Sequence, residues 1–520
     1  MRKGYLLPLF LSASLLAHSQ QNPLPDSPGP FHSDYQPPFF TDGDRNKKIA
    51  AAFPAVEKIY RDYALKNHFP GLAFGIVVDG QLVYSGSMGY ADLSQHQPVN
   101  SLSLFRIASM TKSFTALAIL KLRDDGKLSL EDPVYQYIPE IKKTIALTAD
   151  APPITIRHLL SHSVGFPEDN PWGDRQLADT DDELIQLIEK GISFSNVPGI
   201  SYEYSNLGFA MLGMIITKVS GKPYQQYITE NILDPLGMRH TLWEYTQAPK
   251  NLLAHGYRWL NEKWNEEPLL HDGAYGAMGG LITSIEDFSQ YMAYHLSAWP
   301  PRNEADKGPV KRSSLREMHQ PRTFSSHNLS FKYPNGRTCP TINFYNYGLR
   351  WTRDCEGRIY TGHTGGLPGF GSQWWIMPDY GIGVVAMANL TYAGLSTPNW
   401  AALDTIIAIA DLHPRQLPAS GILIKRKQEL LALLPDWNEA RQSGIFAVNF
   451  FSDNPLDSLK NTSQDLFAKA GKIRRITELI PENQLRGQFV IEGEKGNIRV
   501  SFTLTPENPA LIQQLTIAPL

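Results

Sequence analysis

Short, largely apolar segments bounded by turn residues predict two well-separated groups of strands along this chain. The first group lies at 72–78 and 81–84, and it is joined by Asp79-Gly80, a dipeptide typical of tight hairpins. The second group lies at 347–351, 358–360, 372–377 and 383–388, after a stretch of short helices and loops from about 130 to 300. This order predicts an α/β (α+β) fold with an antiparallel sheet flanked by helices, plus a helical subdomain.

Three helices are expected around that sheet. The first carries Ala55, Ile59 and Tyr63 on one face. The second begins at Ser109, is apolar on all sides at 116–120 and is therefore expected to be buried, and ends where Gly126 supplies a left-handed cap. A third, at about 400–410, completes a main domain that we assign to 49–412.

A proline-rich break at 413–418 separates a last segment, 419–520. Helices are predicted there at 424–434 and 455–470, and strands at 473–480, 488–491, 498–504 and 511–517. In the third strand, apolar residues from Ile498 to Leu504 alternate with polar ones, so one face is buried. We expect a small α+β accessory domain, which resembles cystatin-like domains and those like nuclear transport factor 2.

The N-terminus predicts export. Arg2 and Lys3 precede an apolar run at 5–17, and Ala17-His18-Ser19 follows with small residues suited to signal peptidase. We interpret 1–19 as a secretory signal peptide, too short for a membrane span, and 20–48 as a flexible linker. No later run is long enough for a membrane span, so the expected location is periplasmic or secreted.

Composition narrows the class of protein. With 520 residues, 42% of them hydrophobic and 19% charged, the chain is expected to form two or three soluble domains. A net charge of −3 without a basic stripe excludes a nucleic-acid partner. Cys339 and Cys355 could form a disulfide after export or remain two free thiols. The sequence leaves the oligomeric state open.

The segment Ser109-Met110-Thr111-Lys112 could carry chemistry. Residues three apart on a helix share a face, so Lys112 lies within reach of the Ser109 hydroxyl. Serine is a poor nucleophile until a base takes its proton, and lysine can be that base when burial lowers its pKa. A serine and lysine at this spacing often occur by chance, so the pattern alone is weak.

The surrounding residues make it stronger. The stretch 105–114, Phe-Arg-Ile-Ala-Ser-Met-Thr-Lys-Ser-Phe, resembles the nucleophile segment of the serine β-lactamase and penicillin-binding protein superfamily. Tyr204-Ser205-Asn206 matches its Y-x-N element, and His363-Thr364-Gly365 matches its third element, which we expect just before a strand. The resemblance covers roughly 50–412 and is closest to class C β-lactamases, D-peptidases and related esterases.

The resemblance implies a role for each matching residue. Ser109 would be acylated, Lys112 would accept its proton, and Tyr204 would shuttle protons to and from the leaving group. Nearby cations would lower the pKa of Tyr204, and Lys112 and a protonated His363 could supply them.

The same resemblance implies a substrate-binding set. Asn206 would donate to the acyl amide of the substrate, and His363, Thr364, Gly365 and Gly366 would line the binding strand. The backbone N–H groups of Ser109 and Gly366 would form the oxyanion hole.

His363 departs from the β-lactamase pattern, where lysine is common. Histidine is mostly neutral at pH 7, so carboxylate binding by this residue should be weaker and more pH-dependent. The expected reaction is hydrolysis of a D-amino-acid peptide, an amide or an ester, on a small-molecule or peptidoglycan-derived substrate. A true β-lactamase and a penicillin-binding sensor without turnover remain alternatives.

No cofactor is expected. His158 and His162 are four residues apart like a zinc pair, but no third ligand accompanies them, so packing is favoured over metal binding. Trp374 and Trp375 are adjacent on a predicted strand, so one is expected in the core and the other at the surface.

Overall fold

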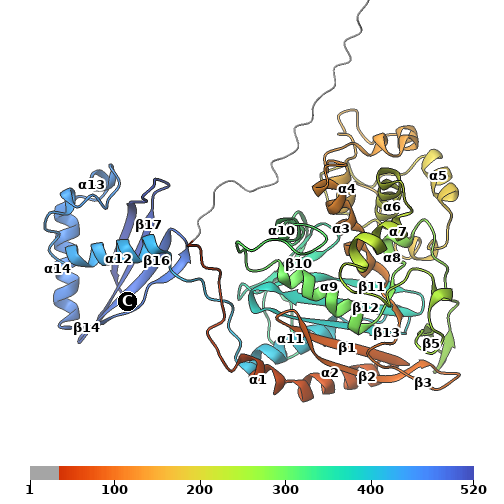
Figure 1. The fold of residues 1–520 in the computed structure, drawn as a ribbon. Coiled ribbons are helices and arrows are strands. Elements are labelled where there is room, and N and C mark those ends of the chain that lie inside the picture. The colour runs from red at the N-terminus through yellow and green to blue at the C-terminus, as the bar shows by residue number, and fades with distance from the viewer. Residues whose placement is uncertain (1–33) are drawn as a thin grey trace, which may run out of the picture. The chain divides into compact units, whose positions relative to one another are not determined.

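The computed structural model describes residues 34–520. The expected signal peptide and residues 20–33 of the expected linker lie outside the described residues. The fold is built on a nine-stranded sheet in the order β3-β2-β1-β13-β12-β11-β10-β9-β8 (Figure 1). Every neighbouring pair is antiparallel, which confirms the expected sheet. Its strands are β1 (Gly71–Val78), β2 (Gln81–Asp92), β3 (Gln97–Pro98), β8 (Thr323–Asn328), β9 (Thr341–Tyr345), β10 (Arg350–Asp354), β11 (Ile359–Leu367), β12 (Phe370–Met377) and β13 (Ile382–Ala388).

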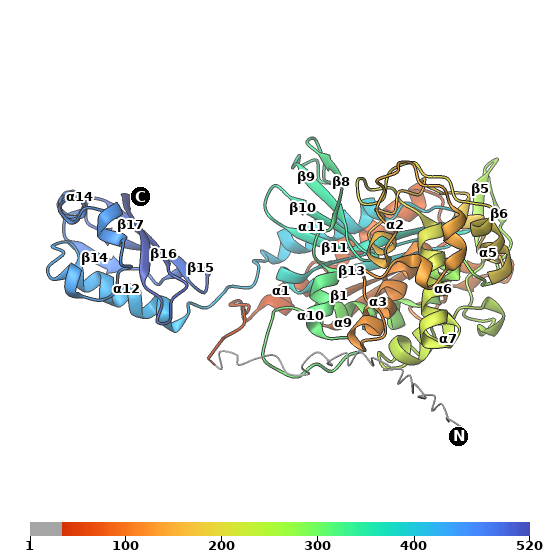
Figure 2. The same cartoon turned by 90° about the horizontal axis from the view of Figure 1, so that it is seen from above.

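Helices cover both faces of this sheet (Figure 2). One face packs on α3 (Thr111–Asp124) and α9 (Ile285–Ser297), and the other on α1 (Arg45–Ala50), α2 (Phe53–Lys66) and α11 (Ser396–Ala410). Burial on both faces explains why β1, β12 and β13 are apolar almost throughout. It also makes one expectation wrong: Trp374 and Trp375 are both buried, each in the core of a different face.

Two further local predictions need correction. The face of α2 that packs on the sheet carries Val56, Tyr60 and Ala64, one residue later than expected, and the expected set is only half-buried. The strand expected at 347–351 begins at Arg350, because Gly348 turns the chain with a φ of 66° just before it.

The helical subdomain lies between β3 and β8 in the chain. Its helices are α4 (Ile156–Leu160), α5 (Asp181–Glu189), α6 (Asn206–Ser220), α7 (Tyr224–Ile228), α8 (Gly276–Gly279) and α10 (Arg312–Met318). Short strand pairs connect them: β4 (Phe105–Arg106) with β7 (Ile282–Thr283), and β5 (Tyr257–Leu260) with β6 (Lys263–Glu266). In the part of the chain that is described, no helix is both long and apolar enough to span a membrane.

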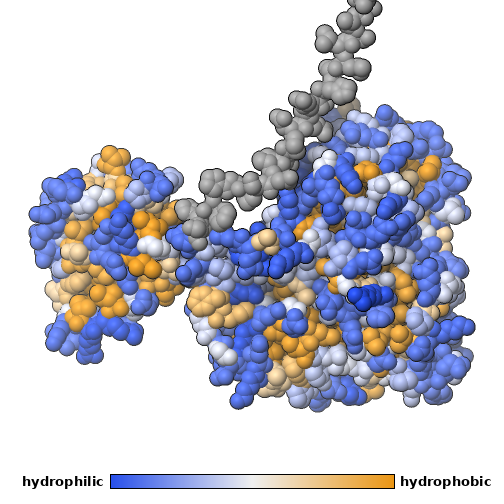
Figure 3. All heavy atoms as spheres, in the orientation of Figure 1, coloured by the Kyte–Doolittle hydropathy of each residue, from blue (hydrophilic) through white to orange (hydrophobic). Residues whose placement is uncertain are grey.

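The C-terminal segment has its own hydrophobic core. A five-stranded antiparallel sheet carries its apolar face toward the helices; the strands are β14 (Ile473–Ile476), β15 (Ile480–Asn483), β16 (Arg486–Gly493), β17 (Asn497–Leu504) and β18 (Ile512–Pro519). The helices are α12 (Gly421–Leu433), α13 (Phe450–Asp453) and α14 (Leu456–Ala470). Exposed apolar side chains here include Val448 and Ile480, and Figure 3 shows hydrophobic patches on the visible face.

Candidate active site

Ser109 lies in a tight turn rather than in the first turn of an α-helix. A 3-10 turn spans Ala108–Met110, and α3 begins at Thr111. Ala108, immediately before the serine, has a φ of 50°, a left-handed conformation that alanine rarely adopts. This strained backbone explains why the expected helix start was slightly misplaced, and it presents Ser109 at the N-terminal end of α3.

The Lys112 amine is fully buried next to Ser109. Its Nζ lies 3.0 Å from Ser109 Oγ, 2.7 Å from Asn206 Oδ1 and 2.9 Å from the backbone oxygen of Met278. Burial lowers the pKa of Lys112 to about 7, with Asp174 and Asp169 opposing the shift. A neutral amine has two N–H donors and one lone pair. Donation to Asn206 and Met278 therefore leaves the lone pair facing the Ser109 hydroxyl, as a general base requires.

Tyr204 completes a third side of the cluster. It is 7% exposed, hydrogen-bonds to Ser109, and has its ring centre 4.9 Å from Lys112 Nζ. Burial raises the pKa of Tyr204 above its usual value, while Arg350 and the Ser109 hydrogen bond act in the opposite direction. At neutral pH the side chain is therefore a phenol, which can give up a proton but does not act as a phenolate base.

Tyr204 and Asn206 are held by the N-terminus of α6. The Asp169 carboxylate accepts the backbone N–H groups of Asn206, at 2.6 Å, and Leu207, at 2.8 Å. The Ser205 N–H donates to Nδ1 of His162, at 3.1 Å, and the His162 ring packs 4.2 Å from the Tyr204 ring. His162 thus has a packing environment, as expected from sequence. Among residues 34–520, no group of three or more His, Cys, Asp or Glu side chains could hold a metal ion.

His363 differs most from its expected role. It lies within β11, not before a strand, and its ring is completely buried. Nε2 is 3.0 Å from the Tyr345 hydroxyl and Nδ1 is 2.5 Å from the Thr364 carbonyl oxygen. Burial, with Arg350 and Lys112 nearby, lowers the pKa of His363 well below its usual value. His363 is therefore neutral, cannot be the second cation, and supports Tyr345 instead of facing the substrate.

Arg350 supplies that second cation. Its guanidinium lies 5.7 Å from the Tyr204 ring centre and hydrogen-bonds to Tyr202. Arginine stays charged at all physiological pH values, so this positive charge does not depend on protonation of His363. Because Arg350 is the first residue of β10 and pairs with Gly362, its position follows from the strand register.

The open edge of β11 carries the predicted binding residues. β10 pairs with β11 only as far as Gly362, so residues 363–366 have β12 on one side and no strand on the other. The two-residue turn after Leu367 makes Leu367 and Phe370 a hydrogen-bonded pair, so by alternation Gly366 is in a non-hydrogen-bonded pair. Its N–H therefore points to the open edge.

Gly365 allows β11 to approach the nucleophile turn. A Cβ at this position would meet the backbone oxygen of Ile107 and Oγ of Ser372. The Ser372 hydroxyl itself donates to the Ile107 oxygen at 2.7 Å. The strand and the turn before Ser109 are thus in direct backbone contact, which brings Gly366 near the serine.

Asn206 is more constrained than expected. Its Oδ1 accepts from Lys112, and its Nδ2 donates to Asn170 Oδ1 at 2.6 Å. Both ends of the amide are therefore held in place, and of the two Nδ2 hydrogens only the one not given to Asn170 can donate to a substrate.

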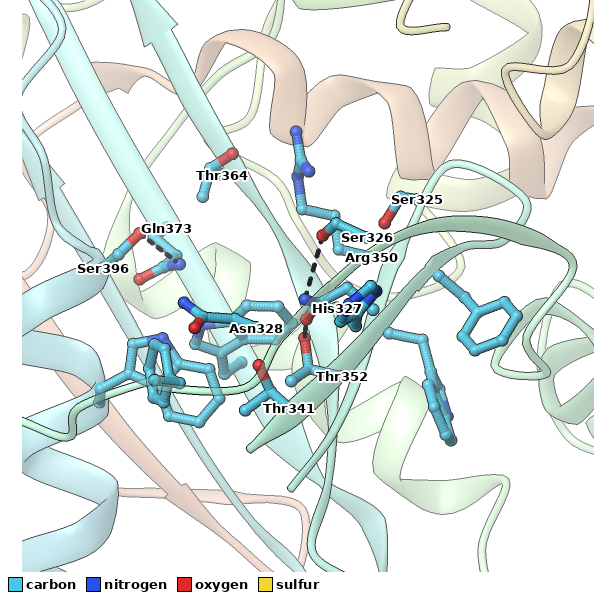
Figure 4. Close-up of a pocket in the computed structure, with 16 residues that line it drawn as sticks. Ser325, Ser326, His327, Asn328, Thr341, Arg350, Thr352, Thr364, Gln373 and Ser396 are labelled. Carbon is cyan, nitrogen blue, oxygen red and sulfur yellow. Dashed lines mark hydrogen bonds between the residues drawn. The ribbon is translucent and has the colours of Figure 1, made fainter. Parts of the chain in front are cut away.

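A pocket of about 480 Å³ borders the cluster, and Arg350 and Thr364 contribute to its wall (Figure 4). The rest of the wall comes mainly from β8, β9, β10 and β12, and it includes hydroxyl, amide and aromatic side chains such as Ser326, Asn343 and Trp375. No Asp or Glu is among the lining residues. The pocket is therefore suited to a polar or anionic group next to the open edge of β11.

Sequence reasoning missed Arg350, His162 as a support, and Tyr345. Arg350 and Tyr345 lie outside the matched motifs, and only the register of β9, β10 and β11 brings them to the site. The cysteines, which the sequence left open, form a disulfide between Cys339 and Cys355.

Fold and site together define a β-lactamase-like protein. The family model described as Beta-lactamase matches residues 49–407, and the chain belongs to that family. Such proteins are generally serine hydrolases.

Among the relatives, Protein flp of Staphylococcus aureus strain MW2 is 30% identical over 331 residues, which cover 62% of this chain and 60% of that protein. Beta-lactamase-like protein 2 of Dictyostelium discoideum is 33% identical over 259 residues, 48% of this chain and 47% of that protein. The chain thus spans about 60% of the length of the first relative and less of the second.

Two solved structures share the fold. An octameric penicillin-binding protein homologue from Pyrococcus abyssi has a TM-score of 0.57 and 22% identity, covering 90% of this chain and 98% of that chain. A D-stereospecific amidohydrolase from Streptomyces has a TM-score of 0.52 and 24% identity, covering 69% of this chain and 97% of that chain.

Proposed function

We propose that the protein is an exported serine acyl hydrolase, periplasmic or secreted, that forms an acyl-enzyme on Ser109 and hydrolyses a D-amino-acid peptide, an amide or an ester. The observation that supports this most is the buried Lys112 amine, 3.0 Å from Ser109 Oγ, with its other contacts made to two oxygens. The D-stereospecific neighbour supports the choice of substrate.

In the first half-reaction, Ser109 Oγ attacks the substrate carbonyl and its proton passes to Lys112. The N–H groups of Ser109 and Gly366 stabilise the oxyanion, each donor contributing about 3 kcal/mol. As the C–N or C–O bond breaks, Tyr204 gives its phenolic proton to the leaving group. The protonated Lys112, whose Nζ lies 4.9 Å from the Tyr204 ring centre, then returns a proton to the Tyr204 phenolate, so Tyr204 and Lys112 both end neutral.

In the second half-reaction, water attacks the acyl carbon. Its proton passes through Tyr204 to Lys112, and Lys112 returns a proton to Ser109 Oγ as the ester bond breaks. Every group is then in its starting state, so no cofactor is consumed.

Arg350 supports a substrate with a carboxylate on the leaving side. It is a permanent cation in the wall of the pocket, beside the hydroxyl-bearing Thr364. The loss of lysine from the third motif element therefore does not remove the positive charge from the site, which favours a D-peptide with a free carboxyl end over a simple ester.

The test is a substrate panel on the wild-type protein and Ser109→Ala. D-alanyl peptides, D-amino-acid amides, p-nitrophenyl esters and nitrocefin would be compared by kcat/KM. We expect peptide, amide or ester turnover that Ser109→Ala abolishes, with nitrocefin slower. Efficient turnover of nitrocefin alone would favour a true β-lactamase. A stable adduct without turnover would favour a penicillin-binding sensor, and turnover retained in Ser109→Ala would refute the proposal.

A further inference from the structure

One buried carboxylate beside the site has no part in the acyl transfer described above. Asp174 is 2% exposed, and its Oδ2 accepts a hydrogen bond from the Tyr392 hydroxyl at 3.2 Å. Its Oδ1 has no hydrogen-bond partner, and within residues 34–520 no Lys, Arg or His forms an ion pair with Asp174. Buried carboxylates are normally paired, whereas the nearest cation that acts on this one, Lys112, does so only at long range.

Asp174 lies within the electrostatic reach of the catalytic cluster. Of the charged groups that act on Lys112, the Asp174 carboxylate has the strongest effect, and it also acts on Tyr204. The carboxylate is therefore close to the reacting groups and not in a remote part of the helical subdomain.

Contacts on both sides place Asp174 beside the space for the acyl group. A Cβ on Gly173 would lie 2.8 Å from Asn206 Cβ, so the preceding residue packs on Asn206. A Cβ on Gly366 would lie 2.9 Å from a ring carbon of Tyr392, the residue that binds Asp174. An acyl group on Ser109 would have the first contact on the side of Asn206 and the second on the side of Gly366. Tyr392 is 42% exposed, so Asp174 is one side chain away from solvent.

We propose that Asp174 binds a free α-ammonium group on the acyl residue of the substrate, which makes the enzyme selective for the amino-terminal residue of short peptides and amino-acid amides. This inference rests on the proposed function, because it assigns the acyl side of the same site. The ammonium supplies the missing cation and donates to Oδ1.

Arg350 lies where it can bind the carboxylate end of a short peptide whose ammonium end is bound by Asp174. Arg350 pairs with Gly362 and Tyr392 packs on Gly366, four residues further along β11, which corresponds to roughly 13 Å of strand. A short zwitterionic peptide laid along this edge would have its ammonium toward Asp174 and its carboxylate toward Arg350. Asp174 and Arg350 together therefore select a small peptide with both ends free.

The test compares D-alanine p-nitroanilide with its N-acetyl form, using the full chain at pH 7. The free α-amino group has a pKa of about 8, so it is mostly charged at that pH. We expect the wild-type protein to prefer the free amine by roughly 10- to 100-fold in kcat/KM, the worth of one charged hydrogen bond. Asp174→Asn should reduce that preference to near one, whatever it does to the turnover of both substrates through Lys112, and an unchanged circular dichroism spectrum would show that the variant folds.

Asp179→Asn is the matched control, because it removes the same charge five residues along the chain, and it should keep the preference. A wild-type ratio near one, a ratio that Asp174→Asn does not change, or an equal loss on both substrates would overturn the inference. In these cases, Ser109-dependent turnover of the N-acetyl substrate would still support the proposed function. Absence of wild-type turnover on both substrates and on the ester panel would refute both.

Discussion

Replacing Lys112 by methionine tests the base directly, because methionine keeps the shape of the side chain but cannot accept a proton. General-base catalysis typically contributes 10²- to 10⁴-fold, so Lys112→Met should lose at least about 100-fold in kcat/KM. Lys121→Met, on the same helix but ion-paired to Asp125 at its surface, is the control and should keep turnover.

The same substitution has a pH-dependent effect on stability. The pKa of Lys112 is lowered from 10.5 to about 7 in the folded protein. Above pH 7 the unfolded chain therefore binds a proton on this lysine that the folded protein does not, and wild-type stability rises with pH until about 10.5. Each pKa unit corresponds to 1.36 kcal/mol, so between pH 7 and 9 the wild-type protein should gain about 2 kcal/mol relative to Lys112→Met.

Urea unfolding followed by fluorescence at pH 7, 8 and 9 measures this difference. Lys112→Met also leaves two acceptors, Asn206 Oδ1 and the Met278 oxygen, without their donor. That cost is the same at each pH, so it does not affect how the stability difference between wild type and variant changes from pH 7 to 9. A stability difference that stays constant from pH 7 to 9, or turnover above a tenth of wild type, would refute the assignment of Lys112 as a neutral buried base.

Three further predictions follow from the site. The value of kcat/KM should rise with pH and level off above about 7, because Lys112 must lose its proton; a profile flat from pH 5 to 9 would contradict this. Arg350→Gln should reduce discrimination between a D-alanyl peptide with a free carboxylate and its C-terminal amide by roughly tenfold, whereas an equal loss on both would show that Arg350 acts only through Tyr204. Gly365→Ala should cost at least about tenfold in kcat, because its Cβ would meet Ile107 and push β11 from the nucleophile turn. The control Gly421→Ala, whose Cβ would lie in open space, should not lower kcat. Unchanged kcat in Gly365→Ala would show that this contact does not position the strand.

Local patterns predicted the parts of the fold that local chemistry determines. The strands that became β1, β12 and β13 were found because they are short apolar runs bounded by turns, and Ser109 and Lys112 were found because their spacing is local. β8 was missed because it is a mostly exposed edge strand. One of Trp374 and Trp375 was wrongly expected at the surface, because burial on both faces of β12 is a property of the whole sheet.

The site itself depended on long-range structure. The second positive charge beside Tyr204, in addition to that of Lys112, was assigned to His363 because this residue lay in a motif. Strand pairing instead brings Arg350 there, and burial keeps His363 neutral. Asp174 gave no signal in the sequence, because its importance comes from what it lacks in three dimensions: a cation. Motifs can identify the reacting atoms, whereas the charges that tune them come from elements distant in the chain.

The most direct test of the acyl-transfer account is rapid quenching during turnover of a D-alanyl ester, followed by mass spectrometry of the intact chain and its peptides. The account predicts a transient adduct with the mass of the acyl group on the peptide that contains Ser109, absent in Ser109→Ala. Turnover without an adduct at any quench time, or an adduct on another residue, would contradict it.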